Sequence, residues 1–247
     1  MIDLKTISTE PPSGISKKEI NKGLVQYRNE LFELQNKFYA DSRFGLLIIL
    51  QGMDTSGKDG TIRHALSGMN PQGVRVKSFK KPTEEELKHD FLWRVYPDIP
   101  EKGMIQVFNR SYYEDILVPR VLNSVSEEIL AHRCKLLKYL EQHLRQNNIH
   151  VLKFFLHISK EQQQERINER LIKPHKRWKY SAEDEKAANQ WGAYQNAYNI
   201  LLGVFETNPR TSLLDIYYET STSGLVTDLN EAAGQSTTID GWEGWDF

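Results

Sequence analysis

A glycine-rich segment at residues 52–60 offers the clearest chemistry in this 247-residue sequence. Gly52 and Gly57 have four residues between them, and Lys58 follows directly. Glycines let backbone N–H groups converge on phosphate oxygens, and a lysine ammonium can bridge two phosphates. The segment follows an apolar run and precedes a helical pattern, which is the context of a P-loop. The candidate phosphate-binding residues are Gly52, Thr55, Ser56, Gly57, Lys58, Asp59 and Gly60.

Two acidic residues distinguish this loop from the common version. Asp59 stands where a Ser or Thr normally binds magnesium, and Asp54 places a carboxylate inside a loop suited to anions. A carboxylate beside phosphates is repelled unless a cation lies between them. Asp54 is therefore predicted to bind Mg²⁺ directly or through water. The alternative is that Asp54 only caps the loop.

A second polar segment, residues 108–115, ends the third expected strand. Ligands bind outside the carboxyl ends of parallel strands, so this segment is expected to face the P-loop. Arg110 is predicted to neutralise a transferring phosphate, and Glu114 or Asp115 to bind metal or orient the acceptor. The alternative is that the two acids cap the next helix.

Basic residues continue into the C-terminal part of the chain. Arg166 and Arg170 lie four residues apart, on one face of an expected helix, and the basic segment 173–180 contains Pro174 and Trp178. This favours a mobile lid at about 166–190 that closes over a polyanion, although a solvated basic loop is the alternative. A long polyanion needs a track of cations. Further candidates for that track are Arg63, Lys77, Lys80, Lys81, Arg110 and Arg120.

Alternating strands and helices are expected to position these groups. Strands are predicted at 45–50, 74–79, 104–108 and 151–158, and the pattern allows a fifth at 213–218. The intervals are long enough for crossover helices, which predicts a parallel α/β sheet. One long helix is expected at 16–39 and another from Ser124 to about 146, because Ser124 and Glu127 have capping-box spacing. A later helix would carry Trp191, Tyr194 and Tyr198.

Composition narrows the class of protein. The 32 Lys and Arg nearly balance the 33 Asp and Glu, so an anion site must come from local clustering. The single cysteine, Cys134, fits a reducing compartment and is expected to be a buried bystander. No apolar run approaches the roughly 20 residues that span a bilayer. We expect a cytoplasmic protein with no membrane or nucleic-acid partner, made of a flexible lead-in (1–15), one domain (16–202) and a partly disordered tail (203–247).

Several segments together resemble the family-2 polyphosphate kinases, over about residues 16–202. The P-loop carries an internal Asp and a trailing Asp-Gly, and Trp191 follows the basic segment in family order. The other matching segments, in family order, are 70–74, 78–80, 89–94, 108–111 and 178–179. No single segment decides the resemblance; the series does.

This resemblance implies a three-layer α/β/α kinase fold with a helical lid. It also implies Mg²⁺ and reversible transfer between inorganic polyphosphate and nucleoside mono- or diphosphates, from AMP to ADP and from ADP to ATP. Asp54 would be the essential loop carboxylate, Lys58 and Arg110 phosphate clamps, and Arg166 and Arg170 lid arginines. The nucleotide-binding residues would be Trp93, Arg94, Asn109, Arg110 and Lys179.

Two positions depart from the family pattern. Asn109 replaces an Asp found in many members, and with Glu114 and Asp115 it resembles the branch that phosphorylates both AMP and ADP. Glu114 or Asp115 would then replace the missing carboxylate, and Asp54 with Asp115 would hold the metal. The tail from Gly203 lacks the family's aromatic final strand and closing helix. Adenine or guanine nucleotides and a homo-oligomer are further expectations.

Two other functions fit the same residues. An ATP-dependent nucleotide or small-molecule kinase would use the same P-loop, because the loop does not name the donor. A binding protein without turnover would hold polyphosphate or nucleotide and transfer nothing. Donor competition separates the first from a polyphosphate kinase, and binding without transfer identifies the second.

Overall fold

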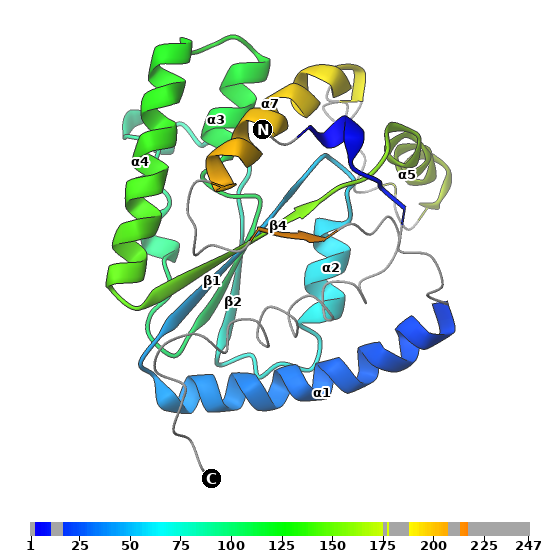
Figure 1. Cartoon of the computed structure of the whole chain (residues 1–247), viewed down its shortest axis with the longest axis vertical. Helices are drawn as coiled ribbons and strands as arrows, with labels where there is room; N and C mark the ends of the chain where they lie inside the picture. The colour runs from blue at the N-terminus through cyan, green and yellow to red at the C-terminus, as the bar shows by residue number, and fades with distance from the viewer. Residues whose placement is uncertain (1–2, 11–16, 175–176, 178–187, 207–212, 217–247) are drawn as a thin grey trace.

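Five parallel strands form one sheet at the centre of the chain (Figure 1). The computed structural model describes residues 3–10, 17–174, 177, 188–206 and 213–216. The strand order is β2-β3-β1-β4-β5. The strands are β1 (Gly45–Gly52), β2 (Val74–Ser78), β3 (Ile105–Asn109), β4 (Ile149–Leu156) and β5 (Leu213–Ile216). The predicted parallel α/β sheet is confirmed, including its fifth strand.

Helices cover both faces of the sheet (Figure 1). On one face, α1 (Lys17–Asp41) and α2 (Lys58–Ala65) pack on apolar side chains of β1 and β3. On the other face lie α3 (Glu114–Val121), α4 (Glu127–Gln146) and α7 (Trp191–Glu206). The α5 helix (Lys160–Ile172) follows β4 at the carboxyl edge of the sheet. This is the three-layer α/β/α arrangement predicted for the chain.

The central position of β1 explains its composition. It pairs with β3 on one side and β4 on the other, and Leu47 and Ile49 are completely buried. A strand covered on both faces needs a continuous apolar run, which Leu46 to Leu50 supply. Its carboxyl end therefore opens in the middle of the sheet, between the ends of β3 and β4.

The start of α4 differs from the expected one. The helix begins at Glu127, and the Ser126 hydroxyl accepts a hydrogen bond from the Ile129 N–H (3.4 Å). Ser124 instead lies in the turn that ends α3, where its N–H donates to the Pro119 carbonyl (3.0 Å). The capping-box spacing of Ser124 gave the wrong cap, because residues 114–121 already form a separate short helix.

The first described residues are docked and do not form the flexible lead-in that was expected. Leu4 begins a 3₁₀ helix and is only 3% exposed, because its side chain enters the core. Its N–H donates to Asn199 Oδ1 on α7 (2.9 Å), and its carbonyl lies 3.1 Å from His157 Nε2. Residues 1–2 and 11–15 lie outside the described part, as does most of the tail beyond Gly203.

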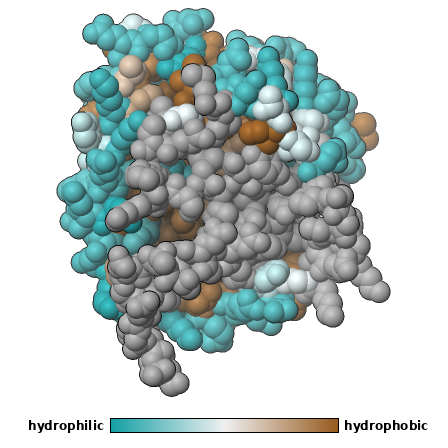
Figure 2. Space-filling model, in the orientation of Figure 1, coloured by the Kyte–Doolittle hydropathy of each residue, from teal (hydrophilic) through white to brown (hydrophobic). Residues whose placement is uncertain are grey.

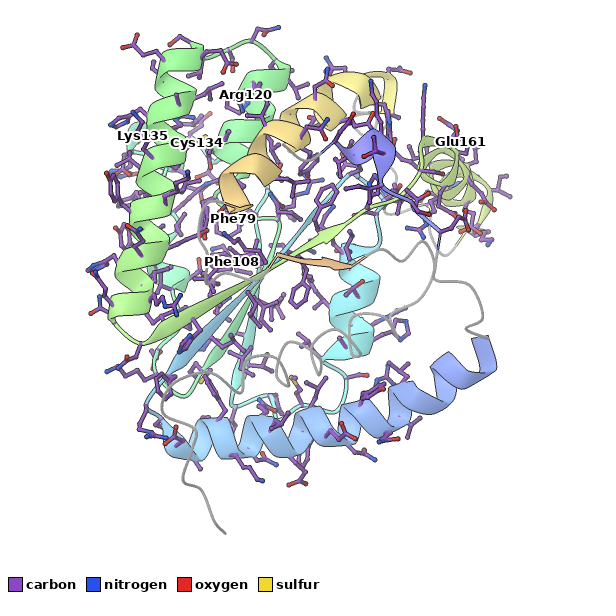
Figure 3. All side chains as sticks on the ribbon, in the orientation of Figure 1. Phe79, Phe108, Arg120, Cys134, Lys135 and Glu161 are labelled. Carbon is purple, nitrogen blue, oxygen red and sulfur yellow. The ribbon has the colours of Figure 1, made fainter. Side chains whose placement is uncertain are left out.

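In the described part of the chain, the buried side chains are mainly apolar. Hydrophilic residues cover most of the coloured surface in Figure 2. Cys134 is buried on α4, as expected, near Arg120 of α3 (Figure 3). Within the described ranges, no helix combines the length and the apolar character needed to cross a membrane.

The corrected cap of α4 can be tested with two serine variants. Ser126→Ala removes the acceptor of the Ile129 N–H and is expected to lower the free energy of unfolding by about 1 kcal/mol. Ser124→Ala, two positions earlier, is the matched control and should change it by less than about 0.5 kcal/mol. Urea unfolding followed by circular dichroism measures both. A larger loss at Ser124 would return the cap to that residue.

Candidate active site

The loop between β1 and α2 has a backbone that requires glycine at two points. Gly52 has φ 151°, and a Cβ there would lie 2.6 Å from the Leu156 carbonyl oxygen. Gly57 has φ 107° and is the residue before α2. Both conformations lie in the region that side chains disfavour. The glycines thus let the loop turn tightly over the end of β4 and direct the first turn of α2 toward the site.

Lys58 is buried at the start of α2. Its ammonium donates to the carbonyls of Gly52 (2.7 Å) and Met53 (2.8 Å) and to Ser56 Oγ (3.2 Å). Burial, and next the charge of Arg110, lower the pKa of Lys58 to about 8. Its three donors are therefore satisfied by the loop itself, and a bound phosphate would replace these acceptors.

Arg110 faces this loop from the end of β3. Its φ is 61°, and its N–H donates to the Leu50 carbonyl (3.0 Å), which fixes the turn to β1. Its guanidinium pairs with Asp54 and lies 3.7 Å from a carboxylate oxygen of Glu114. Burial opposes the charged form, but Glu114 and Asp54 outweigh it and raise the pKa of Arg110. Arg110 is therefore firmly cationic between two carboxylates.

Glu114 is the second carboxylate of this cluster. Burial raises its pKa, whereas Arg110 and Lys58 lower it. Gln51 donates to Glu114 Oε1 (3.3 Å), and its own Oε1 is buried with no hydrogen-bond partner. Mg²⁺ takes hard oxygen ligands, so the side chains of Asp54, Glu114 and Gln51 fit that ion. Among the described residues no three Asp, Glu, His or Cys side chains gather, so a magnesium ion here would need phosphate or water ligands as well.

A hydrogen bond also joins the second segment to the P-loop. Asn109 Nδ2 donates to Asp59 Oδ1 (2.6 Å), across the gap between β3 and α2. Asp59, which replaces the usual Ser or Thr, is exposed and turned toward Asn109. The structure thus brings together Asp54, Lys58, Asn109, Arg110 and Glu114, all of which the sequence had marked as site residues.

Helices α5 and α7 hold the outer side of the loop. Arg166 donates to the Thr55 carbonyl (3.0 Å), and Gln163 donates to the Asp54 carbonyl (2.9 Å). The Tyr198 hydroxyl donates to the Gly52 carbonyl (3.0 Å). Burial, followed by Asp54 and Glu114, raises the pKa of Tyr194, one turn earlier. The sequence assigned no site role to Gln163, Tyr194 or Tyr198; their only signal was the spacing of the two tyrosines on one helix face.

Asp115 and Arg94 lie away from this cluster and pair with each other. Arg94 is buried and donates to Asp115 Oδ2 (2.8 Å) and to the Lys80 carbonyl (2.9 Å). Consecutive residues of a helix point about 100° apart, so Glu114 faces the loop and Asp115 does not. The structure therefore does not bring Asp115 to Asp54 as a shared metal site, and Arg94 connects two segments of the protein.

The other predicted cations are dispersed. Arg120 pairs with Glu127 (2.8 Å) between α3 and α4, so it is held outside the proposed track (Figure 3). Lys77 pairs with Asp98 (2.7 Å). Arg63, Lys80 and Lys81 are exposed, and exposed Trp93 stacks on His89 with ring centroids 4.1 Å apart. Arg170 lies on α5, one turn after Arg166, while Lys179 and residues 178–187 of the expected lid lie outside the described residues.

A comparison with known families decides the assignment. The model of the family described as polyphosphate kinase 2 matches residues 14–211. The chain belongs to the polyphosphate kinase 2 family. This agrees with the resemblance seen in the sequence, and the match includes the P-loop, the β3 end and both flanking helices of the expected lid.

Individual relatives agree with this family. The chain is 46% identical over 177 residues to the AMP/ADP-polyphosphate phosphotransferase of Meiothermus ruber, covering 72% of this chain and 66% of the relative. It is 44% identical over 195 residues to the ADP-polyphosphate phosphotransferase of Rhodopseudomonas palustris, covering 74% and 68%. The chain thus spans about two thirds of the length of these curated relatives. The crystal structure of polyphosphate kinase 2 from Arthrobacter aurescens superposes with a TM-score of 0.86 at 33% identity, covering all of this chain and 89% of that one.

The lowered pKa of Lys58 predicts how phosphate affinity depends on pH. The free protein loses the lysine charge as pH rises through about 8, below the ordinary value of 10.5, while an anion favours the charged form. Affinity for inorganic pyrophosphate without metal should therefore fall up to about 10-fold per pH unit above this value. Isothermal titration calorimetry between about pH 7 and pH 9.5 measures it.

The control for this pH dependence is Lys58→Arg. Arginine stays charged throughout this range, so the variant should bind more weakly at low pH but show a flat profile. The pKa of Lys58 is about 8 in the folded protein and 10.5 at its ordinary value, because the folded protein disfavours the charged lysine. The free energy of unfolding of the wild type should therefore rise between these two pH values. A wild-type affinity that does not change with pH would contradict the role of Lys58 as the phosphate cation.

Proposed function

We propose that this chain is a polyphosphate phosphotransferase that moves a phosphoryl group between inorganic polyphosphate and AMP or ADP. The observation that carries the proposal is the convergence of Lys58, Arg110, Asp54 and Glu114 where β1 and β3 end. The two basic side chains would bind phosphate oxygens there, and the two carboxylates would bind a metal ion. Membership of the polyphosphate kinase 2 family supports polyphosphate as donor, as do the names of the relatives from Meiothermus ruber and Rhodopseudomonas palustris.

The cations have separate tasks in this reaction. Lys58 exchanges its contacts with the loop carbonyls for oxygens of the donor chain, and the start of α2 adds its partial positive charge. Arg110 turns from Asp54 toward the transferred phosphorus and stabilises the charge on its equatorial oxygens. The terminal oxygen of the AMP or ADP phosphate attacks in line as the bond to the polyphosphate chain breaks. The released oxygen leaves with the shortened chain.

The carboxylates Asp54 and Glu114 are proposed to hold Mg²⁺ together with phosphate oxygens. Bound there, the ion would neutralise the charge shared by donor and acceptor. Gln51 keeps Glu114 oriented, and its unpartnered Oε1 would supply a further hard oxygen to that ion. Asp115 takes no direct part in this scheme because Arg94 holds it.

Arg166 and Arg170 of α5 are proposed to receive the polyphosphate chain as it leaves the P-loop. Arg166 already contacts the loop at Thr55. Arg63, Lys80 and Lys81 are proposed to extend the track, and Trp93, Asn109 and Lys179 to contact the nucleotide. A lid over residues 166–190, a cytoplasmic location, homo-oligomers, guanine nucleotides as further substrates and a divergent tail at 203–247 stay predictions.

The proposal is tested with the purified chain, Mg²⁺, ADP or AMP, and long-chain polyphosphate, with product detected by a coupled assay. ATP or ADP is expected to form, and Asp54→Ala should reduce the rate about 100-fold or more, because the cation site and the partner of Arg110 are both lost. Asp41→Ala, which removes a carboxylate paired with Arg43 at the end of α1, is the matched control. Transfer from ATP to AMP, with no use of polyphosphate, would identify an ATP-dependent kinase instead.

Adjacent carboxylates on α3 give a sharper test of the site. Glu114→Gln is expected to reduce kcat about 100-fold while the protein stays folded. Asp115→Asn should leave kcat within about 10-fold but lower the free energy of unfolding by about 1–3 kcal/mol, because it weakens the partner of buried Arg94. Turnover assays and urea unfolding measure the pair. A folded Asp115→Asn variant without activity would restore the metal role that the sequence suggested for Asp115.

A further inference from the structure

Four buried polar side chains form a network between α3, α4 and β4. Glu141 of α4 accepts hydrogen bonds from the hydroxyls of Tyr112 (2.9 Å) and Tyr113 at the same oxygen, Oε1. Its other oxygen accepts from Lys153 Nζ of β4 (2.8 Å). Each of the four residues is at most 4% exposed. All of them lie outside the phosphate site described above.

The two tyrosines connect this network to the site through the backbone. Their carbonyls accept hydrogen bonds in the first turn of α3, from the N–H groups of Asp115 (3.2 Å) and Ile116 (3.0 Å). They occupy two of the three positions between Arg110 and Glu114. Because the Arg110 N–H is held by Leu50 of β1, the turn is fixed at one end by the sheet and in its middle by Glu141.

This turn needs such support. Arg110 has φ 61°, a left-handed conformation that costs free energy for a residue with a side chain and persists only where the surroundings hold it. Arg110 and Glu114 are four residues apart, at the start and the end of the turn that leads into α3, and both side chains face the P-loop. A small rotation of the first turn of α3 would therefore move both groups relative to Asp54 and Lys58.

Stability alone does not account for the network. A buried ion pair loses hydration, and replacing it with apolar side chains of similar volume is often neutral or stabilising. Two phenols on one carboxylate oxygen instead fix the depth and orientation of both rings, because the hydrogen bonds have narrow geometry. The network therefore fixes where the two tyrosine rings lie, more than it stabilises the fold.

We propose that Glu141, paired with Lys153, is a positioning residue for phosphoryl transfer: it holds the hydroxyls of Tyr112 and Tyr113 and so sets Arg110 and Glu114. The inference rests on the proposed function. Glu141 touches no reacting group in this scheme. Its effect passes through the first turn of α3.

Two variants separate positioning from stability. The variant Y112F/Y113F/E141L/K153M replaces the whole network with apolar side chains and should keep a thermal midpoint within about 4 °C of the wild type. Its kcat should fall about 10-fold or more, with KM for ADP and polyphosphate within about 2-fold. Glu141→Gln keeps an acceptor for both phenols but leaves the Lys153 charge unpaired. It should lose more stability than the apolar variant and keep most of its kcat.

The control is Gln35→Met on α1. Gln35 is equally buried and makes two hydrogen bonds to the backbone of Asn70, so its loss destabilises the protein without touching α3. It should lower the thermal midpoint and leave kcat unchanged. A kcat that follows stability across all three variants, or a wild-type kcat in the apolar variant, would overturn the proposal.

A readout without turnover keeps this inference distinct from the proposed function. The guanidinium Nη–H resonance of Arg110, assigned with Arg110→Lys, reports the pairing with Asp54 in the free protein. It should broaden or shift in the apolar variant and stay unchanged in Gln35→Met. A wild type that transfers no phosphate would refute the proposed function, whereas an Arg110 resonance unaltered in the apolar variant would refute the positioning role.

Discussion

The charge balance of four side chains governs this site. Lys58 and Arg110 repel each other, and Asp54 and Glu114 offset that repulsion while the site holds no phosphate. The same carboxylates would repel an incoming phosphate, so a divalent cation is expected to screen them when the substrate binds. The buried, unpartnered Oε1 of Gln51 beside Glu114 agrees with a cation held partly by the protein and partly by substrate. Phosphate and metal are therefore expected to bind together.

The order of the strands in the sheet brings these four charged side chains together. Because β1 lies between β3 and β4, the loop after β1 meets the turn after β3 on one side and the start of α5 on the other. Backbone hydrogen bonds, such as that from Arg110 N–H to the Leu50 carbonyl, set the separation of the two segments. The geometry thus depends on strand register, which packing of the apolar strands fixes.

Local patterns were enough to predict the strands, the P-loop and the facing Arg110, because each rests on an apolar run or on turn chemistry. They were not enough where tertiary packing chooses between neighbours. Glu114 and Asp115 have the same chemistry in the sequence, and only the helix rotation set by the buried tyrosines separates them. Ser124 and Ser126 are a similar case, decided by where α3 ends. The roles of Gln163 and Tyr198 depend on contacts more than 100 residues away in the chain, which no local pattern records.

Those long-range contacts also connect the expected lid to the loop. The carbonyls of Gly52, Asp54 and Thr55 accept from Tyr198, Gln163 and Arg166, respectively. In a trans peptide the carbonyl and the next N–H point in opposite directions, so holding the carbonyls toward α5 and α7 turns the following N–H groups away from those helices. The two helices that shape the loop also precede and follow residues 173–190 of the expected lid in the sequence. If the expected lid closes and changes the spacing of these helices, the movement would act directly on the loop carbonyls that they hold, without a separate relay.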